Sequence, residues 1–153
     1  MRKKLRALVS AVAIGVAVFA AVGMLSSPQQ AEATDKVVVT ISGDVIGVGA
    51  VDGLPLHVGA QASGPAGTLN GQGFDIPPRR AFGIPIGYCR IPLVGTLVGD
   101  VVTLSGNVSF SNDPDNVGVP VTFTANTMTG VITFDFGPFT FIGSGRVRVS
   151  EHQ

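Results

Sequence analysis

The 153-residue sequence has few of the side chains on which most enzyme chemistry depends. It contains one cysteine, Cys89, and two histidines, His57 and His152. A single cysteine excludes an intramolecular disulfide, and so few sulfur and imidazole ligands disfavour a zinc site, which needs about four. A nucleophile also needs a base nearby, and no local motif joins Cys89 to His57. We therefore expect no catalytic machinery, and an enzyme that uses Cys89 or an aspartate is the least favoured class.

Charged residues make up only 13% of the chain, and several lie at the amino terminus. The sequence opens with MRKKLR, continues with an apolar run over residues 7–25, and reaches Ala31-Glu32-Ala33. A basic start, an apolar centre and an A-x-A-like end are the parts of a secretory signal peptide. We predict a signal peptide over residues 1–33, cleaved after Ala33, and a secreted or extracytoplasmic protein. The alternative is an uncleaved anchor, because the apolar run approaches the roughly 20 residues that span a bilayer.

Cleavage would leave residues 34–153, whose net charge differs from the zero net charge of the full chain. It leaves 6 of the 10 basic and 9 of the 10 acidic residues, a net charge of −3. A weakly acidic product has no electrostatic footprint for nucleic acid. It also lacks a basic cluster for anionic lipid and keeps no stable membrane span. Without a disulfide, its stability depends on a hydrophobic core or on self-association, and both remain open.

The sequence after residue 33 alternates between apolar and polar residues, which is typical of half-buried strands. Val102, Leu104, Val108 and Phe110 share one face of a predicted strand, and residues 119–126 and 139–149 alternate in the same way. No stretch after residue 33 carries the apolar stripe of a helix, and the 21 glycines and 10 prolines of the whole chain supply many turns. The pattern predicts an all-β, single-domain protein: an antiparallel β-sandwich or a small flattened β-barrel of about 8 strands.

Two segments of the chain resemble each other. VVTISGDV, residues 38–45, matches VVTLSGNV, residues 101–108, at six of eight positions. Downstream, GLPLHVGA from Gly53 resembles GVPVTFTA from Gly118. We interpret these as duplicated hairpin units in repeat-like halves, at about 36–62 and 100–130. Two such hairpins could bury their apolar faces against each other.

The connection between the halves, at about 62–88, is rich in glycine, proline and arginine. Long ordered connections often carry function. Arginine can receive a carboxylate or phosphate through two parallel hydrogen bonds. We predict that the connection contacts a surface partner or a small ligand, and the candidate contact residues are Arg79, Arg80, Phe82, Tyr88 and Arg90.

The stretch SNDPDNVG, residues 111–118, gathers oxygen-bearing side chains around one proline. An EF-hand is excluded, because the loop lacks the bidentate glutamate and a strand pattern follows it. A type I turn explains the stretch without a ligand, since Asp113 suits its first position and Pro114 its second. A looser calcium site is the alternative, and its candidate ligands are Asn112, Asp113, Asp115 and Asn116. Calcium is the only cofactor that the sequence suggests.

Most aspartates, including Asp44 and Asp75, adjoin glycine or lie in apparent turns, where local hydrogen bonding favours aspartate. Asp135 lies between two phenylalanines in a strand pattern, and Arg146 or Arg148 could pair with it. His57 falls on the polar face of its predicted strand, which is typical of a solvent-facing side chain.

The sequence contains nine phenylalanines, one tyrosine and no tryptophan, which disfavours a sugar-binding surface and favours a phenylalanine-rich core. We expect a binding or structural module outside the cytoplasm. The alternative is a small barrel carrier for an apolar or anionic ligand, with phenylalanines lining the cavity and arginines at its mouth.

Overall fold

The computed structural model describes residues 35–76 and 88–152. These residues all belong to one compact unit of the chain, residues 35–153. Its strands are β1 (Lys36–Val48), β2 (Pro55–Gly64), β3 (Leu69–Ile76), β4 (Cys89–Val98), β5 (Val101–Asn107), β6 (Phe110–Ser111), β7 (Pro120–Asn126), β8 (Val131–Phe136) and β9 (Phe139–His152), with two short 3₁₀ turns, η1 (Gly49–Val51) and η2 (Pro114–Asn116).

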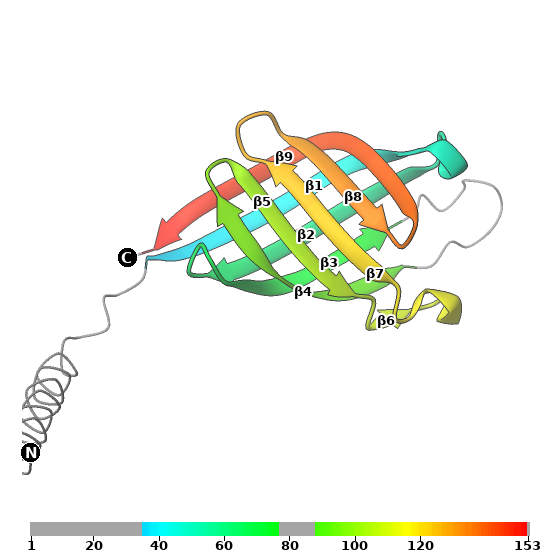
Figure 1. Cartoon of the computed structure of the whole chain (residues 1–153), viewed down its shortest axis with the longest axis horizontal. Helices are drawn as coiled ribbons and strands as arrows, with labels where there is room; N and C mark the ends of the chain where they lie inside the picture. Colours follow the sequence, from blue (N-terminus) through cyan, green and yellow to red (C-terminus); the bar gives the residue numbers. More distant parts are fainter. Residues whose placement is uncertain (1–34, 77–87, 153) are drawn as a thin grey trace, which may run out of the picture. The chain divides into compact units, whose positions relative to one another are not determined.

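The strands close into an antiparallel barrel of eight strands, with β6 as an additional short strand (Figure 1). Strands that follow one another along the chain pair with each other around the barrel. The exception is β5, which pairs with β7 because β6 lies outside the ring. The first and last strands, β1 and β9, complete the ring through a ladder from Lys36 and His152 to Val48 and Thr140. The all-β prediction is confirmed, and of its two alternatives the structure is the barrel.

The interior of the barrel is filled with apolar side chains. Alternation places Val39, Ile41 and Val45 of β1 inside, while Thr40 and Asp44 face outward. Phe123 of β7 and Phe134 of β8 have no accessible surface, and their ring centroids lie 4.8 Å apart. A side chain without accessible surface borders no void that could hold a water molecule. These two phenylalanines are therefore core residues and do not line a cavity.

Two facing glycines, the buried Gly43 and the exposed Gly145, permit the close approach of β1 and β9. Gly43 and Gly145 are register partners. A Cβ atom on Gly43 would lie 2.6 Å from Ile132 Cδ1 and 2.9 Å from Gly145 Cα. No larger side chain fits here without displacing the core or the partner strand, so glycine is required by space.

Part of the predicted connection, at about 62–88, is a strand. β2 extends to Gly64, and β3 occupies Leu69–Ile76, pairing with both β2 and β4. The glycines of this segment suggested a loop, but Gly73 is an inward strand position. A Cβ atom there would lie 2.7 Å from Leu93 Cδ1 and 2.9 Å from Phe123 Cε2, so the large core ring takes the space.

The predicted face of Phe110 is wrong. The chain shifts register by one residue between β5 and β6: Val94 pairs with Ser105, whereas Arg90 pairs with Phe110. This extra residue is a β-bulge, and one residue of slip exchanges the two faces of a strand. Val102, Leu104 and Val108 are buried as predicted, but Phe110 is 54% exposed and Ser111 faces inward.

The two similar segments both form hairpins with their following partners, β1 with β2 and β5 with β7. Their registers differ, because Gly43 pairs with Val58 and the equivalent Gly106 pairs with Val121. The shift is an even number of residues, so the same side chains point inward in both hairpins. The duplication itself stays a prediction.

Candidate functional site

Arg90 is the candidate contact residue that the structure places most clearly. It lies exposed near the start of β4, and its register partners are Phe74 of β3 and Phe110 of β6. Partners in register share a face of the sheet, so Phe74, Arg90 and Phe110 form an outward row across three strands, the Phe–Arg row. Ile76, 42% exposed, continues the apolar surface along β3.

Of the other predicted contact residues, the structure describes only Tyr88. Tyr88 precedes β4, is half-buried and accepts a backbone hydrogen bond from Asn112 N–H through its carbonyl. Arg79, Arg80 and Phe82 lie outside the described residues. The sequence pattern did not predict that Phe74 and Phe110 face outward. Glycines interrupt the alternation around Phe74, and a bulge reverses the faces of the strand before Phe110.

Cys89 is buried at the same end of the barrel, on the face opposite to Arg90. Its Sγ lies 3.5 Å from Ser111 Oγ, and its N–H donates to Asp75 Oδ1 at 3.0 Å. Burial, together with the nearby Asp75, raises the pKa of the Cys89 thiol to about 11. A thiol with this pKa holds its proton near neutral pH, so it is poorly suited to act as a nucleophile.

Asp75 is a buried carboxylate, which the sequence had suggested to be a turn residue. It faces inward from β3 as the register partner of Cys89 and is 5% exposed. Desolvation by burial raises the pKa of its carboxyl above the ordinary value of 3.8, although the Cys89 thiol and backbone amide lower it in part. The pair Asp75–Cys89 is the most perturbed titratable cluster in the described part of the chain.

His57 pairs with an aspartate across two strands. Its Nδ1 lies 2.9 Å from Asp44 Oδ1, and the two residues are register partners on β2 and β1. Asp44 is therefore a strand residue and not a turn residue. The side chains are 44% and 88% exposed, so the pair lies in solvent and contributes at most about 1 kcal/mol.

SNDPDNVG forms the turn that the sequence predicts. Asn116 N–H donates to the Asp113 carbonyl at 3.1 Å, which closes a turn with Pro114 at its second position. Asp113 Oδ1 also accepts from Asp115 N–H at 3.1 Å. Within residues 35–76 and 88–152, no group of three or more His, Cys, Asp or Glu side chains could share a metal ion. Calcium at Asn112, Asp113, Asp115 and Asn116 stays an untested prediction.

Asp135 has a partner other than the predicted arginines. Its Oδ1 accepts from Thr140 Oγ1 at 2.7 Å, and the two residues are register partners on β8 and β9. Arg146 and Arg148 lie further along β9, beyond the paired part of β8. The polar-face position of Asp135 was predicted, but the partner depended on a register that the pattern does not contain.

The fold and these contacts define the molecule as a closed antiparallel β-barrel with a packed interior. Comparison with protein-family models, with curated proteins and with solved structures gives no match. In the described part of the chain, no helix has the length and hydropathy that crossing a bilayer requires.

Proposed function

We propose that the protein is an exported, non-catalytic β-barrel that binds a partner outside the cytoplasm through its outer surface. The observation that carries the proposal is the Phe–Arg row, an arginine between two outward phenylalanines on adjacent strands. A guanidinium flanked by apolar surface suits a partner that offers a carboxylate or phosphate beside an apolar group.

The packing of the interior supports binding at the surface over carriage inside the barrel. The largest interior rings, Phe123 and Phe134, have no accessible surface, and neither do Ile91 and Leu104 from other strands. A carrier would need an apolar void bordered by such side chains. The buried, protonated thiol of Cys89 likewise gives little support to an enzyme built on that residue.

Photo-crosslinking in the producing cells tests the proposal. A benzoylphenylalanine at position 110 is expected to give a discrete crosslinked product. The control position is Val98, which is 72% exposed at the other end of β4. Arg90→Glu should abolish the product from position 110, because it reverses the charge at the centre of the Phe–Arg row. A product of equal yield from both positions, or one indifferent to Arg90→Glu, would refute the proposed surface.

Export rests on the amino-terminal pattern and has its own test. Intact mass measurement of the protein recovered outside the cytoplasm should give a chain that begins at Thr34. Recovery of the protein only from the cytoplasm would remove export from the proposal, and recovery in membranes with the leader intact would favour the anchor.

A further inference from the structure

The last strand continues past its neighbour and leaves one edge of the sheet open. β8 begins at Val131, which pairs with Ser144, and Gly145 N–H donates to the Gly130 carbonyl at 2.9 Å. From there to His152, β9 pairs only with β1 among the described residues. Figure 1 shows β1 and β9 extending together beyond β8 toward the carboxyl end.

The backbone groups on this open edge can be assigned from the register. Because Gly145 donates toward β8, its ladder position with Gly43 is one that does not exchange hydrogen bonds with β1. The β1–β9 register is constant, so the same holds for every second residue. The N–H and C=O groups of Val147, Val149 and Glu151 therefore point away from β1.

A shallow, open surface pocket lies beside the open edge. It has a volume of about 610 Å³ and lies between the β7–β8 turn, residues 127–130, and residues 145–148 of β9. Asn126 holds the turn by accepting from Met128 N–H and Thr129 N–H through Oδ1, each at 2.9 Å. The turn is thus held in place, and among the described residues its only backbone hydrogen bond to β9 is the one from Gly145 to Gly130. Beyond that bond, the pocket gives an incoming strand room to pair.

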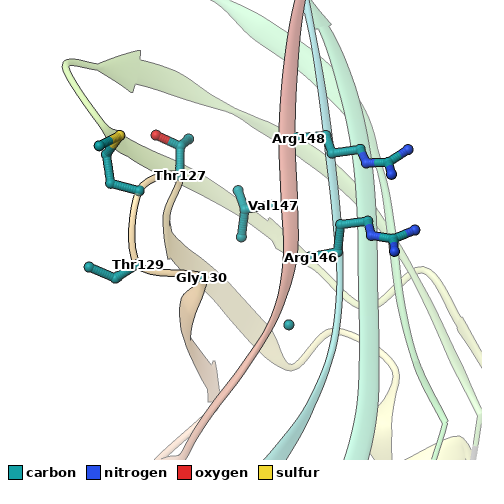
Figure 2. Close-up of a pocket in the computed structure, with 8 residues that line it drawn as sticks. Thr127, Thr129, Gly130, Arg146, Val147 and Arg148 are labelled. Carbon is teal, nitrogen blue, oxygen red and sulfur yellow. The ribbon is translucent and has the colours of Figure 1, made fainter.

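The side chains of β9 alternate in chemistry along the edge. In Figure 2, Arg146 and Arg148 extend from β9 on one side, and Val147 extends on the other, toward the turn. Both arginines are exposed, and their register partners Ser42 and Thr40 are neutral. Within the described residues, no carboxylate lies within ion-pairing distance of either arginine. Val147 and Val149 are half-buried against the core.

From this alternation we propose that β9 binds an extended peptide strand whose residues alternate between apolar and acidic. The backbone of the peptide pairs with Val147, Val149 and Glu151, its acidic side chains lie beside Arg146 and Arg148, and its apolar side chains lie beside Val147 and Val149. Strand addition obtains affinity from backbone hydrogen bonds and specificity from alternate side chains. This site is separate from the Phe–Arg row, so either can fail without the other.

Charge distinguishes an acidic strand from a second copy of the chain. Antiparallel pairing of β9 with another β9 would bring two arginines from each copy onto one face of the joined sheet. Like charges on neighbouring strands are destabilising, and charged side chains commonly prevent edges from pairing with themselves. An acidic strand would instead place its carboxylates beside Arg146 and Arg148, and these opposite charges attract.

The test uses fluorescence anisotropy with the barrel unit, residues 35–153. The probe is a short, capped and fluorescein-labelled peptide in which valine and glutamate alternate, and a valine–lysine peptide serves as its control. The wild type should bind the first peptide and not the second. The double variant R146E/R148E should weaken binding of the acidic peptide by about tenfold or more and gain binding of the basic one.

A proline substitution tests the backbone pairing separately from charge. Val149→Pro removes one N–H that faces the open edge and no hydrogen bond to β1, so its melting temperature should stay close to that of Val149→Ala, which also lacks the half-buried valine, and the peptide should be lost. Val149→Ala is the matched control and should retain binding, since it keeps the N–H. Failure of the acidic peptide to bind, or its binding unchanged by Val149→Pro, would overturn the proposal. Dimerisation through β9, abolished by Val149→Pro, would also overturn it by making a second copy the partner.

Discussion

Cys89 and Asp75 face each other inside the barrel, and burial sets the chemistry of both. Cys89 is a small buried residue, as a free cysteine usually is. Sequence reasoning placed Asp75 in a turn, since the neighbouring glycines and prolines hide the fact that β3 is a strand. Whether an aspartate is buried depends on which strands flank it, and a local pattern does not carry that information.

The Cys89 thiol should resist alkylation in the folded protein. With a pKa of about 11 and no exposed surface, the side chain forms little thiolate at pH ~8 and is closed to reagent. Iodoacetamide followed by intact mass measurement should show no adduct on the native protein and one adduct after denaturation. Rapid, complete modification of the native protein would contradict the burial of Cys89.

Asp75→Asn should raise stability at neutral pH and leave it unchanged in acid. The folded-state pKa of Asp75 is raised above 3.8, so the folded protein holds this proton more tightly than the unfolded chain does. As the pH rises above 3.8, the unfolded chain ionises first, and the free energy of unfolding of the wild type falls. Asparagine keeps an acceptor for Cys89 N–H but carries no charge.

Melting curves of wild type and Asp75→Asn across pH provide the measurement. The two melting temperatures should coincide at the acid end and diverge in favour of the variant as the pH increases. A wild type that gains stability relative to the variant with increasing pH would show the opposite linkage, and desolvation of the Asp75 carboxyl could not then be the dominant effect.

The strands with clear alternation were predicted, including β9 with its glycines at 143 and 145, whereas β3 and the outward face of Phe110 were not. The patterns at residues 102–105 and 119–126 correspond to β5 and β7, where core and solvent faces differ in every second residue. β3 was missed because Gly73 makes room for Phe123 from another strand. The outward face of Phe110, and with it the Phe–Arg row, depends on a one-residue bulge that has no local signature.

Gly43→Ala should weaken the junction of β1 and β9. The added methyl group would lie 2.6 Å from Ile132 Cδ1 and 2.7 Å from the Ser144 carbonyl oxygen, so core and backbone must both move. Overpacking of this kind costs about 1–3 kcal/mol of unfolding free energy. Gly67→Ala is the matched control, because apart from its own and the adjoining residues no atom lies within 4 Å of the methyl group there.

Urea denaturation of both variants measures the difference. The midpoint should fall for Gly43→Ala, and the unfolding free energy of Gly67→Ala should stay within about 0.5 kcal/mol of wild type. Equal stability of the two variants would mean that β1 and β9 do not approach as closely as the structure shows.

For the whole molecule, alternation specified an all-β protein but not how its sheet ends. A sandwich and a barrel use the same pattern, and only the pairing of the first strand with the last separates them. That ladder pairs Lys36 with His152, which are far apart in the sequence. A local sequence pattern therefore cannot predict the pairing. The same ladder produces the open edge, since β9 follows β1 beyond the start of β8.

Residue-resolved amide hydrogen exchange on residues 35–153 tests the closed barrel with its open edge most directly. The amides of Thr40, Ser42, Arg146 and Arg148 should exchange slowly, because β1 and β9 hold them in the closing ladder. Those of Val147, Val149 and Glu151 should exchange fast, giving an alternation along one strand. Fast exchange at all of these amides would contradict closure, and slow exchange at all of them would contradict the open edge.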